Sequence, residues 1–150
     1  MDIFTVSLFG HRQITKPLDI EAALVKEVSL LIRTKEYVEF LIGRNGEFDL
    51  LAASLIRQTQ KKIDFGNSAL VLVLPSATKN TADLERYYDE VEIFGEDCHF
   101  KAALQARNRI MVDRSDLVIC CIEHQSGGAY QTVKYAKNQH KTIINLAEGK

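Results

Sequence analysis

Short apolar runs of strand length alternate along the chain with longer segments of helical period. The apolar runs predict strands at Ile3–Phe9, Tyr37–Ile42, Ala69–Leu74, around Val91 and Ile93, at Leu117–Ile122 and at Thr142–Leu146. The segments between them predict helices from Pro17, from an Asp49 cap to Lys62, near Ala82–Tyr88, from about His99 to Asp113, and from Gly127-Gly128 to about Gln139. Strand and helix therefore alternate throughout the chain.

This alternation predicts an α/β fold, a three-layer Rossmann-like sandwich with a mainly parallel sheet. The Ala69–Leu74 run is apolar throughout, as expected of a central parallel strand with both faces covered. We expect a single domain over residues 1–150, because no Ser/Gly-rich stretch or internal repeat divides the chain. In such sheets ligands bind beyond the carboxyl ends of the strands. The functional residues are therefore expected in the loops at that edge.

Composition argues against several classes of partner. The 150 residues include 19 basic and 20 acidic side chains, giving a formal net charge of -1. Such a balance argues against a protein that coats nucleic acid or an anionic membrane through its overall field. No apolar run approaches the roughly 20 residues of a membrane-spanning helix, so no membrane partner is expected. Cysteine usage fits a reducing cytoplasm, since adjacent Cys120 and Cys121 lie in an apolar run and no Cys-x-x-Cys pair occurs.

Three loops at the expected edge combine glycine with polar or basic groups: Gly10-His11-Arg12, Gly43-Arg44-Asn45-Gly46 and Ser126-Gly127-Gly128. Glycine lets the backbone approach a ligand closely, and the N–H groups at a following helix N-terminus favour phosphate. Arg12 adds donors that match phosphate oxygens. The same glycines could simply form tight turns, but three such loops at one edge favour a phosphate site. Neither a G-x-G-x-x-G dinucleotide signature nor a Walker A lysine loop is present, which argues against a dehydrogenase and a P-loop ATPase.

Arg107 is the most informative single residue. It follows Phe100 and Leu104 and precedes Met111 at the spacing of one helix face, so it is expected on an apolar stripe. An arginine there needs a partner. It could extend its head group to solvent, pair with a core carboxylate, or project past the sheet edge toward a ligand phosphate or sugar. The histidines show no metal-ligand spacing on one helix, so neither a metal nor a cofactor is predicted.

One pattern resembles a known superfamily. The run Arg107-Asn108-Arg109-Ile110-Met111 leads to Ser115-Asp116, and then to Ser126-Gly127-Gly128 and Thr132. This pattern resembles the SLOG superfamily of Rossmann-like proteins, which includes the Lonely Guy proteins and the DNA-processing protein A family. The resemblance covers nearly the whole chain and is strongest to a bacterial branch with an N-terminal G-H-R loop, here Gly10-His11-Arg12. It implies a site for a nucleotide-derived ligand between the first loop and the double-glycine loop, and it implies a homodimer.

The resemblance also suggests a reaction. In Lonely Guy enzymes, which release the base from a nucleoside monophosphate, an arginine at the position of Arg107 acts with a glutamate in a P-G-G-x-G-T-x-x-E motif. Here Ser126 replaces the proline and Lys134 falls where the glutamate would be. A carboxylate stabilises the oxocarbenium-like transition state of such a reaction, whereas a lysine opposes it. Glu123, at the end of a predicted strand, could supply the carboxylate instead.

Three functions remain in competition. The leading one is a sensor or carrier domain for a small nucleotide-like phosphate ligand, and the alternative is a phosphoribohydrolase. Single-stranded DNA binding is the lesser alternative and nucleic acid is not the expected partner, since Arg107, Arg109 and Arg114 point to different helix faces. The acidic segment 76–98 is expected to be either a lid or a solvated connection. The ligand-binding candidates are Gly10, His11, Arg12, Gly43, Asn45, Gly46, Asn108, Ser126, Gly127, Gly128 and Thr132, and the catalytic candidates are Arg107 and Glu123.

Overall fold

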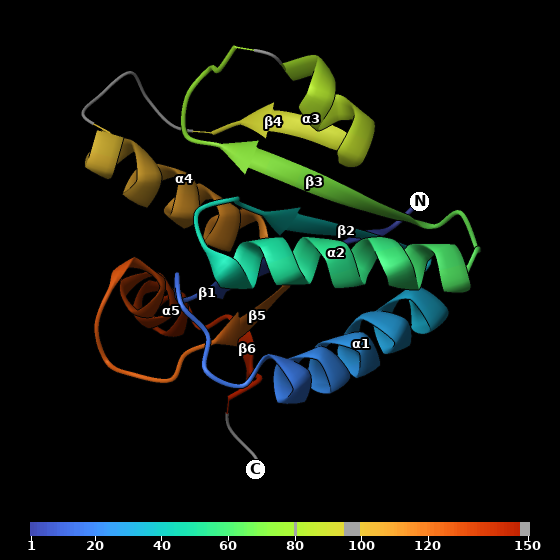
Figure 1. Ribbon diagram of the computed structural model, residues 1–150, viewed down its shortest axis with the longest axis horizontal. Helices are drawn as coiled ribbons and strands as arrows, with labels where there is room; N and C mark the ends of the chain where they lie inside the picture. The colour runs from blue at the N-terminus through green and yellow to red at the C-terminus, as the bar shows by residue number, and fades with distance from the viewer. Residues whose placement is uncertain (80, 95–99, 148–150) are drawn as a thin grey trace.

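The computed structural model describes residues 1–79, 81–94 and 100–147, and Figure 1 shows how their elements are arranged. The strands are β1 (Ile3–Gly10), β2 (Tyr37–Ile42), β3 (Ser68–Leu74), β4 (Glu90–Ile93), β5 (Leu117–Cys121) and β6 (Thr142–Asn145). The helices are α1 (Pro17–Thr34), α2 (Glu47–Lys62), α3 (Thr81–Tyr87), α4 (Phe100–Arg114) and α5 (Gly128–Asn138). The six strands form one parallel sheet, which confirms the predicted α/β fold.

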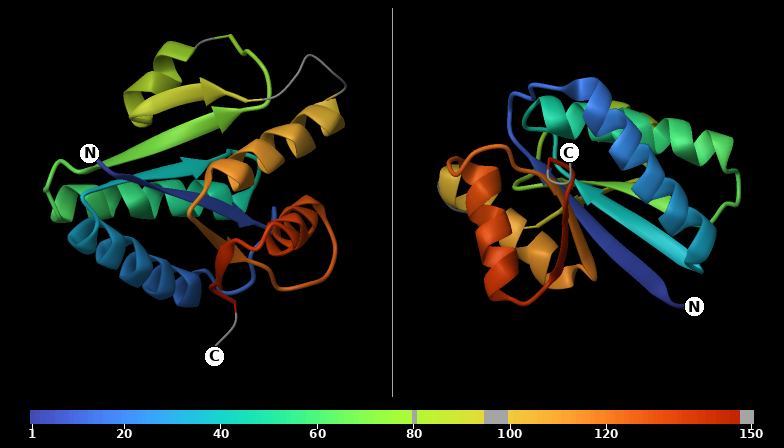
Figure 2. Two further views of the ribbon diagram at one scale, coloured as in Figure 1. Left: turned by 180° about the vertical axis from the view of Figure 1, so that it is seen from behind. Right: turned by 90° about the horizontal axis from the view of Figure 1, so that it is seen from below.

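Side chains of the central strands alternate between two apolar layers, because successive residues of a strand point to opposite faces. Leu70 and Leu72 of β3 pack in the layer that contains α1 and α2. Val71 and Val73 pack in the layer that contains α4 and α5. Figure 2 shows these two helix pairs on opposite sides of the sheet. The fully apolar sequence of β3 is thus explained by burial on both faces.

The order of the strands determines where a ligand can bind. From β1 the sheet continues through β2 and β3 to β4 in one direction, and through β5 to β6 in the other. The order therefore reverses between β1 and β5, and the loops that follow these two strands diverge to opposite faces of the sheet. The loop after β2 lies next to the loop after β1. The three glycine loops consequently meet at one edge, as the sequence predicts.

The beginning of α2 differs from the prediction. Asp49 was expected to cap this helix, but the helix begins at Glu47 and Gly46 occupies the N-cap position. Asp49 lies in the first turn, and its carboxylate accepts a hydrogen bond from the backbone N–H of Asn45 at 3.0 Å. The backbone N–H of Glu47 donates to the carbonyl of Arg12 at 2.8 Å. This bond between two loops starts the helix earlier than the local sequence indicates.

Gly10 is required by the close approach of β1 to α2. A Cβ atom at this position would lie 2.2 Å from Cγ of Phe48. The Phe48 side chain is fully buried, so it cannot move aside without disturbing the core. The contact fixes the first turn of α2 against the end of β1.

Replacing Gly10 by alanine should therefore lower the free energy of unfolding by about 1–3 kcal/mol, the usual cost of overpacking a core. Urea denaturation measures this change. Gly128→Ala is the matched control, because a Cβ there would meet only the flexible Gln105 side chain, at 3.5 Å. Equal stability of the two variants would contradict the close contact between Gly10 and Phe48.

Candidate functional site

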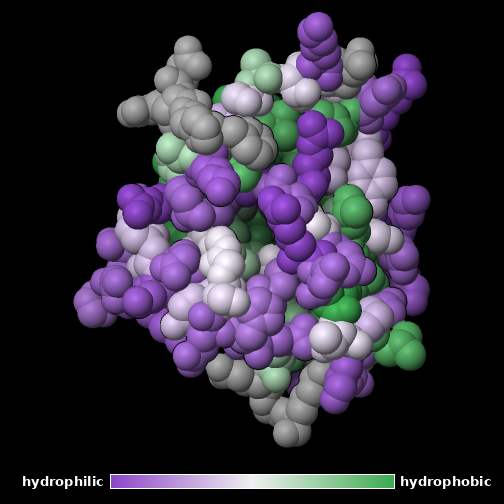
Figure 3. Space-filling view, turned by 60° about the vertical axis from the view of Figure 1, so that its left-hand side comes forward, coloured by the Kyte–Doolittle hydropathy of each residue, from purple (hydrophilic) through white to green (hydrophobic). Residues whose placement is uncertain are grey.

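A cavity of about 590 Å³ opens at the carboxyl edge of the sheet, among the three glycine loops and the helices α4 and α5. Figure 3 shows a hollow on this side of the molecule, with an apolar floor between hydrophilic side chains. Its volume lies in the range of small-molecule sites. The cavity is lined by Leu8, Phe9, Gly10, His11, Arg12, Gln13, Gly43, Asn45, Asp49, Leu104, Gln105, Arg107, Asn108, His124, Gly127, Gly128 and Ala129.

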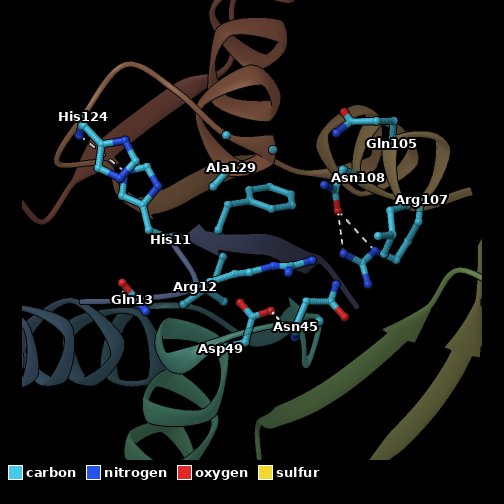
Figure 4. A pocket seen from close by; sticks show the side chains of 17 residues that line it. His11, Arg12, Gln13, Asn45, Asp49, Gln105, Arg107, Asn108, His124 and Ala129 are labelled. Carbon is cyan, nitrogen blue, oxygen red and sulfur yellow. Dashed lines mark hydrogen bonds between the residues drawn. The ribbon is translucent and has the colours of Figure 1, made fainter. Parts of the chain in front are cut away.

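Arg107 projects from α4 to the carboxyl ends of β2 and β3, and only 4% of its surface is exposed. Its Nε and Nη2 atoms donate to Oδ1 of Asn108, at 3.2 and 2.8 Å (Figure 4). Nη1 donates to the carbonyl of Val73 at 3.3 Å. With its amide turned so that the oxygen faces the guanidinium, Asn45 accepts from Nη1 and Nη2 at 3.0 and 2.9 Å. These bonds hold the guanidinium in one orientation.

The partners of Arg107 leave its charge uncompensated by direct contact. They are amide and carbonyl oxygens, and no carboxylate of the described residues lies within 4.0 Å of the guanidinium. Burial lowers the pKa of Arg107, and the nearby Asp49 opposes this shift. Among the three alternatives drawn from the sequence, the structure therefore shows a buried arginine that lines the cavity. A fixed positive charge in such a place favours an anionic ligand.

Asp49 is a cavity residue that the sequence reasoning used only as a helix cap. Its Oδ2 lies near the backbone of Gly43, where an added Cβ would be 3.2 Å away. Burial raises the pKa of Asp49, whereas the Asn45 N–H and the charge of Arg107 act to lower that pKa. The signal that could have identified it is its position three residues after Gly46, in the first turn of a helix that starts at the ligand edge.

Arg12 and the N-terminus of α5 face the cavity from other directions. Arg12 is exposed at its mouth, and Figure 4 shows the side chain extending toward Arg107. Helix α5 begins at Gly128 without a side-chain cap, so its first N–H groups remain available to an anion. Gly127 has φ 92°, a left-handed conformation that disfavours other residues, and it turns the chain into the helix.

His11 and His124 stack on one side of the cavity with ring centroids 3.7 Å apart. Nε2 of His11 accepts hydrogen bonds from the backbone N–H groups of Glu123 and His124, at 3.1 and 3.4 Å. An accepting Nε2 carries no proton, so His11 is neutral in this arrangement. Burial and the neighbouring His124 lower the pKa of His11, and Glu123 opposes the shift. The ring therefore connects the loop after β1 to the loop after β5.

The structure brings most of the predicted ligand-binding residues to the cavity. Those that line it are Gly10, His11, Arg12, Gly43, Asn45, Asn108, Gly127 and Gly128. Three others, Gly46, Ser126 and Thr132, are not among the lining residues. Gly46 is packed so closely on Arg12 that an added Cβ would be 2.5 Å from its Cα. Ser126 bonds to the His124 ring at 2.9 Å, and Thr132 accepts from Nδ2 of Asn108 at 3.0 Å.

The two catalytic candidates are placed differently. Arg107 lines the cavity, but Glu123 is not among the lining residues. The Glu123 carboxylate instead accepts a hydrogen bond from the hydroxyl of Thr15. Position 123 therefore does not supply the cavity with the carboxylate that the phosphoribohydrolase reaction needs.

The described part of the acidic segment 76–98 lies away from the cavity. Strand β4, which follows helix α3, forms the edge of the sheet next to β3, and no described residue between 76 and 94 lines the cavity. Residues 80 and 95–98 of this segment lie outside the described ranges. The described residues 76–79 and 81–94 therefore contribute no lining to the cavity.

Comparison with known proteins supports the fold. No family model matches the chain, and no curated protein matches it. Among solved structures, DNA processing protein A (DprA) from Streptococcus pneumoniae aligns with a TM-score of 0.67 and 16% sequence identity. The alignment covers 94% of this chain and 49% of the DprA chain, so this chain spans about half the length of DprA. The chain therefore has a DprA-like fold.

In this DprA-like chain, the described helices include none with the length and hydropathy of a membrane span. Across the same ranges, no three His, Cys, Asp or Glu side chains are grouped to hold a metal ion.

Lowering the pH from about 7.5 to about 5.5 should destabilise the native chain more than a His11→Asn variant. The unfolded state takes up a proton near the ordinary histidine pKa of 6.5, whereas His11 in the folded state does not, because its pKa is lowered. The stability that this difference provides is present above the unfolded pKa and is lost as the pH falls.

Urea denaturation at the two pH values measures the effect. His140→Asn is the matched control, since His140 is exposed and has φ 59°, a conformation that asparagine tolerates. This control should lose as much stability as the native chain. If the free energy of unfolding of His11→Asn falls as much between the two pH values as that of the native chain, His11 is not held neutral in the folded state.

Proposed function

We propose that this chain binds a small phosphate-bearing, nucleotide-derived ligand in the cavity and acts as a sensor or carrier domain. The observation that carries the proposal is the buried Arg107 guanidinium, which is held by neutral oxygens and keeps its positive charge beside the cavity. Arg12 and the uncapped N-terminus of α5 supply further donors. Groups of this kind, converging from three elements, suit the several oxygens of a phosphate.

The architecture of the site favours a small ligand over a nucleic-acid strand. Arg107 is buried within the cavity, so a strand lying across the surface would not reach it directly. Arg109 packs over the ring of Tyr135, and Arg114 pairs with Glu92 at 3.6 Å. The three arginines of α4 therefore lie in different environments. They do not form the continuous basic groove that binding of a single strand requires. The likeness of this chain to DprA concerns the fold alone.

Calorimetry with ribonucleoside 5′-monophosphates and ADP-ribose tests the proposal. Arg107→Met should weaken binding by about tenfold or more, because hydrogen bonds to a charged group are worth roughly 1.5–3 kcal/mol. Arg109→Met is the matched control on the same helix and should bind as the native chain does, since Arg109 is exposed. Absence of binding for every nucleotide, or full binding by Arg107→Met, would overturn the proposal.

Arg12→Ala provides a second variant that does not depend on the core. Arg12 is exposed and makes no hydrogen bond through its side chain within the described residues, so this change should weaken binding without lowering the melting temperature. The same incubations should be monitored for free base. Base release that requires Glu123 would favour the phosphoribohydrolase alternative, and its absence would leave the binding function.

A further inference from the structure

Among the described residues that line the cavity are positive groups and one carboxylate, and an ionised carboxylate has no role in holding a phosphate. Arg12, Arg107 and the start of α5 supply donors, while Asp49 supplies only acceptors when ionised. Two phosphate oxygens facing Asp49 would be repelled by it. A ligand that satisfies the whole lining must therefore present an anionic group to the arginines and a hydrogen-bond donor to Asp49.

Asp49 is held in a defined position. Its Oδ2 accepts from the Asn45 N–H at 3.0 Å, and the residue lies in the first turn of α2, where Phe48 is fully buried. No described residue donates to Oδ1 of Asp49. Oδ1 is nevertheless not fully buried, since Asn67 Oδ1 is the one fully buried side-chain oxygen or nitrogen without a partner among the described residues. Figure 4 shows the second oxygen of Asp49 on the side of the cavity where Arg12 lies. One carboxylate oxygen is thus open to a ligand.

We propose that Asp49 accepts a hydrogen bond from a sugar hydroxyl of the ligand, so that the cavity selects ribose phosphates over bare phosphate and over sugars without these hydroxyls. The inference rests on the proposed function and specifies its ligand class. Ribose carries its hydroxyls within a few bonds of the 5′-phosphate, which matches a cavity where Arg107 and Asp49 both lie beside Gly43. A site built to bind a hydroxyl discriminates strongly against a ligand without it, because the buried partner is left unpaired.

The test compares AMP with 2′,3′-dideoxy-AMP by calorimetry on the full chain. The native chain should bind AMP about tenfold or more tightly than the dideoxy analogue. In Asp49→Asn this ratio should fall below about threefold, because the open acceptor loses its charge. Asp64→Asn is the matched control, since Asp64 is exposed beyond the other end of α2 and should keep the native ratio. Inorganic phosphate should bind Asp49→Asn at least as tightly as it binds the native chain.

The outcomes separate this inference from the proposed function. Equal binding of AMP and its dideoxy analogue by the native chain would overturn the role of Asp49, while Arg107-dependent binding of both would leave the proposed function standing. If Asp49→Asn lowers the affinity for AMP and for the dideoxy analogue by the same factor, the ratio of the two affinities stays as in the native chain. That result would show that Asp49 has a structural role only, and it would also overturn the inference. If no nucleotide binds the native chain, the proposed function and this inference fail together. Even if Asp49→Asn does not fold, a native ratio near one would overturn the inference.

Discussion

The common direction of the six strands is the constraint on which the site depends. A parallel sheet places every strand's carboxyl end at one edge, so loops far apart in the sequence are brought together without any direct signal between them. The reversal of strand order between β1 and β5 then separates their following loops and leaves room for a cavity. Contacts such as Gly10 against Phe48 and the bond from Glu47 to Arg12 hold these loops in place.

The electrostatics of the cavity follow from how its charged groups are satisfied. A buried arginine is costly unless its donors are paired, and here amide and carbonyl oxygens pair them. A direct carboxylate partner would have neutralised the site. Asp49 instead lies near enough to influence Arg107 and is bonded to the backbone of Asn45. The cavity therefore combines a positive group and a negative group, each with its own direction, which suits a ligand that carries both acceptors and donors.

The fold could be predicted further than the site. Apolar runs located the strands closely, and Tyr37–Ile42 was predicted with its observed bounds. The helical period of α4 also predicted that Arg107 lies on a buried face. The start of α2 could not be predicted in the same way, because the Arg12 carbonyl that accepts from Glu47 belongs to a distant loop. Asp49 was consequently interpreted as a cap and not as a residue of the cavity.

For Glu123 the sequence predicted the position in the fold but not the direction of the side chain. Its position at a strand end placed it at the correct edge, but the direction of its side chain depends on Thr15, which lies 108 residues earlier in the chain. Sequence by itself determined the α/β architecture, the edge at which the glycine loops meet and the apolar helix face that includes Arg107, because these follow from local periodicity and strand direction. Only the tertiary structure decided which side chains face the cavity, because that choice depends on packing and hydrogen bonds between loops that no local pattern encodes.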